Sequence, residues 1–131
     1  MVRVSYYEIY NENIKDLLAP DTPPKTLVVR EDENKGIFIS NIKEEVVTSY
    51  EEMIKCVETG SIHRTVGCTL MNETSSRSHS IFTIILEQRI SDPSSSGSTS
   101  TGCGSSDTDE GFKMAKFHLV DLAGSERNKR T

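Results

Sequence analysis

Residues 117–127 read FHLVDLAGSER, and this stretch decides the class of fold that the sequence predicts. An apolar run ends in Asp121, and Gly124 follows three residues later. In α/β nucleotide-binding sites, ligands gather at the carboxyl ends of strands, where an Asp can hold Mg²⁺ through water and a Gly lets backbone N–H groups approach a phosphate. The plainer alternative is a strand that stops at an Asx-type turn containing a glycine.

A second polar stretch lies upstream, where residues 72–79 read NETSSRSH and precede an apolar run. Hydroxyl groups can ligate Mg²⁺ and orient water, and an arginine can pair with a carboxylate or a phosphate. On spacing alone, a serine-rich turn that leads into a strand explains the same residues. Each stretch alone is therefore weak evidence for a nucleotide site, and the prediction depends on both stretches together.

Several apolar or alternating segments predict strands. Val2, Val4 and Tyr6 alternate with polar or aromatic neighbours, which is the period of two that a strand requires. Further strands are expected at 27–30, 36–40, 46–48, 81–90 and 112–122. An acidic turn separates the first two of these.

Helices are expected between the strands. Ile14, Leu17 and Leu18 have helical spacing, which predicts a short helix that ends before Pro20. Ser49 and Glu52 form a predicted capping box for a second helix, with Gly60 as its C-terminal stop and loop over 61–72. Strands mixed with helices indicate an α/β fold, with a central, mostly β sheet flanked by helices.

Residues 91–111 form a segment of different composition. Fifteen of these 21 residues are Ser, Thr or Gly, a composition too poor in apolar groups to offset the entropy of ordering the backbone. The sequence therefore predicts a disordered loop insertion between two strands. We interpret it as a passive insertion, because the closure entropy of a loop grows only slowly with its length.

The composition of the 131 residues narrows the class of protein further. The length fits one domain, and the net charge of −5 argues against a nucleic-acid binder. No apolar run approaches the roughly 20 residues that span a bilayer. The three cysteines are far apart in the sequence, which argues against a disulfide framework and for a reducing compartment. The sequence contains no CxxC pair, which argues against a zinc site.

Taken together, residues 72–79 and 121–127 (DLAGSER) resemble the switch I and switch II motifs of the kinesin motor domain. Residues 2–18, VRVSYYEIYNENIKDLL, resemble a kinesin strand and turn. The resemblance covers 2–90 and 112–131, and the end of the chain is most similar to the kinesin-4 (chromokinesin) group. It implies the central portion of the kinesin motor fold, which is P-loop NTPase-like and here incomplete.

The resemblance implies ATP and Mg²⁺ as ligands and gives a role to each matching residue. Ser76 would ligate Mg²⁺, and Asp121 would hold it through water. Ser75 and Asn72 would position the γ-phosphate and the attacking water, and the Gly124 N–H would reach the γ-phosphate.

Two arginines complete the roles that the resemblance implies. Arg77 would form a salt bridge with Glu126 that closes the pocket, and Arg64 would match a switch-region arginine. Two loops would thus sense the γ-phosphate and relax after hydrolysis.

The parent protein would be a microtubule-stimulated ATPase that moves along microtubules. Its partner would be tubulin, with no membrane and no direct nucleic-acid contact from this segment, and a coiled coil outside these residues would allow a homodimer. It would act in the cytoplasm on the cytoskeleton, or in the nucleus or spindle if it is chromokinesin-like.

One departure from the family pattern shapes a further expectation. These residues contain no GxxxxGKS/T motif, the phosphate-binding loop that kinesins carry upstream, and they stop just after the switch II motif. We therefore expect an internal piece of a motor domain that neither hydrolyses ATP nor moves alone.

Three alternatives stay open at this point. The first is a non-catalytic, truncated kinesin-like module that binds tubulin or another protein. The second is an unrelated hydrolase that uses Ser, His and Asp, although the sequence has no GxSxG elbow. The third is a GTPase that uses the DLAG residues, although neither a P-loop nor an NKxD segment is present.

Overall fold

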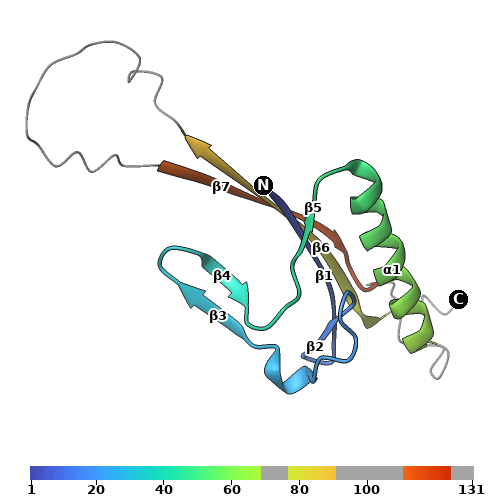
Figure 1. The fold of residues 1–131 in the computed structure, drawn as a ribbon. Helices are drawn as coiled ribbons and strands as arrows, with labels where there is room; N and C mark the ends of the chain where they lie inside the picture. The colour runs from blue at the N-terminus through green and yellow to red at the C-terminus, as the bar shows by residue number, and fades with distance from the viewer. Residues whose placement is uncertain (69–76, 91–110, 125–131) are drawn as a thin grey trace, which may run out of the picture.

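The computed structural model describes residues 1–68, 77–90 and 111–124, and for residues 65–68 it describes the backbone alone. A twisted sheet carries the helix α1 on one face, and a two-stranded hairpin extends on the other (Figure 1). The predicted loop 91–111 lies outside the described residues except for Gly111, which begins a strand. Among the described residues, no helix is long and apolar enough to cross a membrane.

The central sheet has five antiparallel strands in the order β2-β1-β6-β7, with β5 also paired to β1. Their bounds are β1 Val2–Tyr10, β2 Asn13–Asp16, β5 Glu45–Val47, β6 His79–Ile90 and β7 Gly111–Asp121. One edge of β1 takes β5 at its start and β2 at its end, while the other edge pairs with β6. The predicted strands are confirmed, and the outer edge of the sheet is β7.

The predicted helix at Ile14–Leu18 is wrong, because these residues form β2 and its continuation. Asn11 and Glu12 both have positive φ, at 48° and 64°, which is the signature of a two-residue hairpin turn between β1 and β2. The Leu17 N–H then donates to the Tyr6 carbonyl oxygen at 2.9 Å and extends the pairing. The helical spacing of three apolar residues was outweighed by this tight turn.

Buried Asp16 ends β2 by accepting hydrogen bonds from backbone groups. Its Oδ1 accepts from the Leu18 and Ala19 N–H groups at 2.9 and 3.2 Å, and its Oδ2 accepts from the Lys43 N–H at 2.7 Å. The carboxylate is 1% exposed, yet both of its oxygens have donors. Because each donor belongs to the backbone, Asp16 fastens the loop before β5 to the end of β2.

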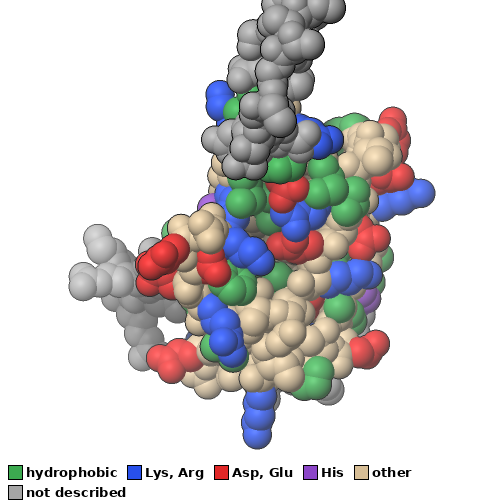
Figure 2. Space-filling model, turned by 60° about the vertical axis from the view of Figure 1, so that its left-hand side comes forward, with side chains coloured by type: hydrophobic (Ala, Val, Ile, Leu, Met, Phe, Trp, Pro, Cys, Tyr) green, Lys and Arg blue, Asp and Glu red, His purple; other side chains and the backbone are tan. Residues whose placement is uncertain are grey.

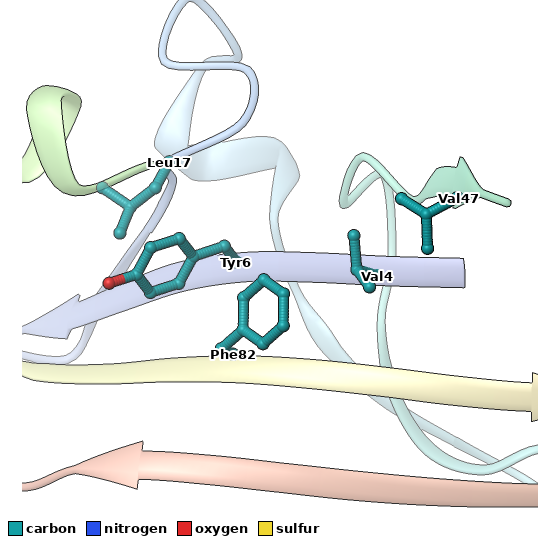
Figure 3. Packing of buried hydrophobic residues seen from close by; sticks show 5 residues of the cluster. All are labelled: Val4, Tyr6, Leu17, Val47 and Phe82. Atoms are coloured by element: carbon teal, nitrogen blue, oxygen red, sulfur yellow. The ribbon is translucent and has the colours of Figure 1, made fainter. Parts of the chain in front are cut away.

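The hydrophobic core lies between the sheet and α1. It consists of buried side chains from β1, the chain after β2, β5 and β6: Val4, Tyr6, Leu17, Val47 and Phe82 (Figure 3). The Tyr6 and Phe82 rings meet edge to face with centroids 5.4 Å apart. Met53, Cys56 and Val57 of α1 pack against this cluster and cover it.

The helix α1, Tyr50–Cys68, begins as predicted but does not stop at Gly60. The Glu52 N–H donates to Ser49 Oγ at 3.3 Å, as the capping box predicts, whereas the Glu52 carboxylate accepts from the N–H of Thr48, the residue before the N-cap, at 2.7 Å. Gly60 is buried in the middle of the helix, where a Cβ atom would lie 2.0 Å from Cδ1 of Tyr6. The glycine therefore serves the close approach of α1 to β1, and the predicted loop from residue 61 is wrong through residue 68.

The hairpin of β3, Val29–Asp32, and β4, Gly36–Ile39, follows the short 3₁₀ turn Pro24–Thr26. It lies over the sheet face that α1 leaves open, and the Lys116 ammonium of β7 donates to the Lys35 carbonyl oxygen at its tip. A groove of about 480 Å³ runs between hairpin and sheet. Apolar side chains line most of it, with a polar row that includes Tyr7, Thr83 and His118.

Tyr7 predicts a loss of stability at alkaline pH. Burial raises the pKa of its phenol above the ordinary value of 10.0, with a smaller opposing effect from its hydrogen bond with Thr83. The phenol ionises more easily in the unfolded chain than in the folded one. Its contribution to the free energy of unfolding is therefore complete below pH 10 and is lost as the pH rises through the raised pKa. Tyr7→Phe should therefore flatten the alkaline fall in the free energy of urea unfolding. Tyr50→Phe, at an exposed tyrosine, is the control, and an unchanged slope in Tyr7→Phe would contradict the expectation.

Candidate functional site

The candidate site lies where three strands of the central sheet meet at one end. β7 ends at Asp121, which pairs with Ser80 near the start of β6. His79, the first residue of β6, pairs with Ile9 near the end of β1. The antiparallel register thus brings the predicted motif region after β7 and the one before β6 to the same end of the sheet.

Arg64 of α1 joins the elements at this end of the sheet. Its Nη1 donates to Oδ2 of Asp121 and to the hydroxyl of Ser80, both at 3.1 Å. Its Nη2 lies 3.5 Å from the carbonyl and hydroxyl oxygens of Ser78. One guanidinium therefore contacts both strands of the pair β6–β7 and Ser78 just before β6.

A buried carboxylate faces the same guanidinium. Glu8 of β1 has a side chain only 11% exposed, and its Oε2 lies 3.5 Å from Nε of Arg64. Among the described residues, neither of these two atoms has a hydrogen-bond partner, so their attraction is a charge contact rather than a hydrogen bond. A buried charge is costly when it is alone, and Arg64 is what compensates Glu8.

The segment after β7 is fastened to the start of β6 by a histidine. The Ala123 N–H donates to Nδ1 of His79 at 2.9 Å. This bond fixes the chain between Asp121 and Gly124, which is the region of the predicted phosphate contact. Asp121 itself is open to solvent, with a side chain 73% exposed.

Four of the predicted site residues lie among the described ones, and one of them, Arg64, makes the contacts with Asp121 and Glu8 given above. Asp121 and Gly124 lie at the end of β7 and just beyond it, and exposed Arg77 lies just before β6. The other predicted residues, Asn72, Ser75, Ser76 and Glu126, fall outside the described residues. The salt bridge of Arg77 with Glu126 stays a prediction for the same reason.

Glu8 and His79 are parts of the site that the sequence reasoning missed. The signal for Glu8 was present, because the alternation of Val2, Val4 and Tyr6 places Glu8 on the same, buried face of β1. A carboxylate on the core face of a strand predicts a charged partner nearby. For His79 no comparable signal existed, since its bond joins residues 44 positions apart.

The family model of the kinesin motor domain matches residues 1–131. The human chromosome-associated kinesin KIF4A is 45% identical over 130 residues, which are 99% of this chain and 9% of that protein. The kinesin-like protein KIN-7N of Arabidopsis thaliana is 40% identical over 131 residues, which are 100% of this chain and 14% of that protein. A solved structure of a fast kinesin, described for its ATPase mechanism and its interactions with microtubules, matches 99% of this chain and 32% of its own with a TM-score of 0.75 and 38% identity.

The sheet with α1 on one face thus matches the fold of a microtubule motor. The chain belongs to the kinesin motor domain family. The likeness to KIF4A supports the predicted resemblance to the kinesin-4 group. The chain spans a small share of the curated relatives that it matches, between 9% and 14% for the two named here.

Proposed function

We propose that residues 1–131 form the part of an ATP-dependent microtubule motor that responds to the γ-phosphate of ATP. The observation that carries this proposal is the contact of Arg64 with Asp121 and Glu8 at the end of the sheet. It ties the residue that would face the nucleotide to the helix α1 and to the centre of the sheet. A change at the nucleotide can therefore reach the body of the domain through one side chain.

The residues of the site fit Mg²⁺ and a nucleotide phosphate in their chemistry. Mg²⁺ prefers oxygen ligands and keeps several of its waters, and the exposed carboxylate of Asp121 suits a water-mediated contact. In this proposal Ser76 is a direct ligand and Asp121 acts through water. When bound, Mg²⁺ would neutralise developing charge on the transferred phosphoryl group.

The other residues of the site position groups around the phosphate. Ser75 and Asn72 orient the γ-phosphate and the attacking water, and the Gly124 N–H approaches the γ-phosphate. Arg77 pairs with Glu126 and closes the pocket. The bond from Ala123 to His79 holds the backbone before Gly124 in place, so that its N–H is aimed before the phosphate arrives.

The partner and setting of the parent protein are part of the same proposal. The whole motor binds microtubules, hydrolyses ATP when bound to them, and moves along them. It acts in the cytoplasm on the cytoskeleton, with the spindle or nucleus as a further setting that the chromosome-associated relative favours. A homodimer would form through a coiled coil outside these residues.

A chimeric motor tests the role of Asp121. Residues 1–131 replace the matching segment in the motor domain of the human relative, and Asp121→Asn is compared with the parent chimera. The variant keeps an acceptor for Arg64 but loses the charge, and microtubule-stimulated ATPase should fall by about 10- to 100-fold and need more Mg²⁺. Glu58→Gln, on an exposed part of α1, is the matched control. Full activity of Asp121→Asn at low Mg²⁺ would contradict the assignment.

A further inference from the structure

The backbone that carries the His79 side chain is held on both sides. His79 itself pairs with Ile9 of β1. Its neighbours Ser78 and Ser80 are only 1% and 3% exposed, and the guanidinium of Arg64 contacts both of them. The half-buried imidazole therefore projects from a fixed point at the end of the sheet.

The chain after β7 leaves the strand ladder next to this imidazole. The last pair between β6 and β7 is Ser80 with Asp121, and a further pair would set Leu122 opposite His79. Instead, the N–H of Ala123 donates to Nδ1 of His79 at 2.9 Å. A side chain thus replaces the ladder as the acceptor for the first residues beyond the strand.

This bond restricts the direction of the next backbone N–H. Because a backbone N–H can only donate, Nδ1 of His79 is the unprotonated nitrogen, and the proton of the neutral ring is on Nε2. The bond holds the N–H of Ala123, and only the two soft torsions of Ala123 lie between that group and the N–H of Gly124. His79 therefore limits the directions that the Gly124 N–H can take.

We propose that His79 is a positioning residue that strengthens the binding of a nucleoside triphosphate and leaves the binding of a diphosphate unchanged. The inference rests on the proposed function, in which the N–H of Gly124 approaches the γ-phosphate. A diphosphate lacks this phosphoryl group, so the direction of the Gly124 N–H affects the triphosphate alone. A donor that is aimed before the ligand arrives costs less to order on binding.

General charge attraction does not provide this selectivity. The 131 residues carry a net charge of −5, which disfavours the more anionic of the two nucleotides. On the face that Figure 2 shows, basic side chains lie among acidic ones and do not gather in one patch. A selective gain for the triphosphate therefore needs an aimed contact, and the bond from Ala123 to His79 aims one at the end of the sheet.

Three substitutions of His79 separate its acceptor atom from the rest of the side chain. Asparagine places its amide oxygen where Nδ1 of histidine stands, so it can accept from the N–H of Ala123. Glutamine carries its acceptor one bond further from the backbone, and leucine has no acceptor. His79→Asn should therefore keep the bond, whereas His79→Gln and His79→Leu should lose it.

Nucleotide binding by the chimeric motor described above tests the selectivity. Dissociation constants are measured for ADP and for a non-hydrolysable ATP analogue, both with Mg²⁺. His79→Leu and His79→Gln should weaken binding of the analogue by about 3- to 10-fold, the effect of one hydrogen bond, and should change that of ADP by less than about twofold. His79→Asn should bind both nucleotides as the parent chimera does.

Amide hydrogen exchange of the 131-residue chain tests the bond without nucleotide. The amide of Ala123 should exchange about 3- to 10-fold faster in His79→Leu and His79→Gln than in the native chain or His79→Asn. The amide of Leu17, which donates to the Tyr6 carbonyl oxygen, is the internal control for an intact sheet. Its exchange rate should be the same in all four proteins.

Three results would overturn the inference. The first is an equal loss of ADP and analogue binding in His79→Leu, which would make the role of His79 merely structural. The second is an unchanged ratio of the two dissociation constants in that variant. The third is a His79→Gln variant that matches His79→Asn in both experiments. A parent chimera that does not bind the analogue would instead contradict the proposed function, and the inference would fall with it.

Discussion

Replacing Arg64 with methionine should lower the free energy of unfolding by about 3–5 kcal/mol, because it leaves a buried carboxylate without a charged partner. Glu8 has a side chain 11% exposed and faces Nε of Arg64 at 3.5 Å. Methionine keeps the aliphatic part of the side chain, so the loss reports mainly the charge and the hydrogen bonds to Ser80 and Asp121. Urea unfolding of the 131-residue chain at a fixed protein concentration measures the effect.

Two further variants separate the charge effect from a general disturbance of α1. Lys55→Met, at an exposed lysine of the same helix, should change the free energy of unfolding by no more than about 0.5 kcal/mol. Arg64→Met combined with Glu8→Leu should recover most of the loss, since both charges are then gone. If Arg64→Met unfolds as easily as Lys55→Met, the buried pair does not stabilise this end of the sheet.

Gly60→Ala should destabilise the chain by about 1–3 kcal/mol, although alanine is the better helix former. The favourable change in helix propensity is only about 1 kcal/mol. Against it stands a Cβ atom that would lie 2.0 Å from Cδ1 and 2.5 Å from Cε1 of Tyr6. The Tyr6 ring is 9% exposed and held edge to face by Phe82 (Figure 3), so it has little room to move aside.

Thr59→Ala is the control for Gly60→Ala, because Thr59 is the preceding residue of α1 and is exposed. It should leave the melting temperature nearly unchanged. Gly60→Ala in a Tyr6→Leu background should cost less than in the native chain, because the clashing ring is gone. A Gly60→Ala variant as stable as the native chain would mean that α1 does not approach β1 as closely as the structure has it.

Most of the strands could be predicted from the sequence, whereas the strand β2 and the C-terminal end of α1 could not. Alternation and apolar runs identified β1, β6 and β7, because successive side chains of a strand point to opposite faces and their polarity indicates which face is buried. The prediction was wrong at Ile14, Leu17 and Leu18, because three apolar residues at this spacing fit either a helix or a hairpin. The positive φ angles of Asn11 and Glu12 form the hairpin turn and decide between the two. Gly60 misled because the sequence does not show that Tyr6 lies under it.

The candidate site was predictable to the extent that it depends on strand ends. The predicted strand that ends in Asp121 is confirmed by the bounds of β7. The contact of Asp121 with Arg64 joins residues 57 positions apart, so it depends on how α1 packs and no local pattern contains it. Glu8 lies between these two cases, because its burial follows from alternation while its partner does not.

A gliding assay with the chimeric motor tests the central claim most directly. The chimera carries residues 1–131 in place of the matching segment of the human relative, is fixed to a surface, and is supplied with fluorescent microtubules. We expect microtubules to glide when Mg-ATP is added and to stop when it is removed. A chimera that folds and binds microtubules, yet neither hydrolyses ATP nor moves them, would show that these residues do not supply the nucleotide-responsive part of a motor.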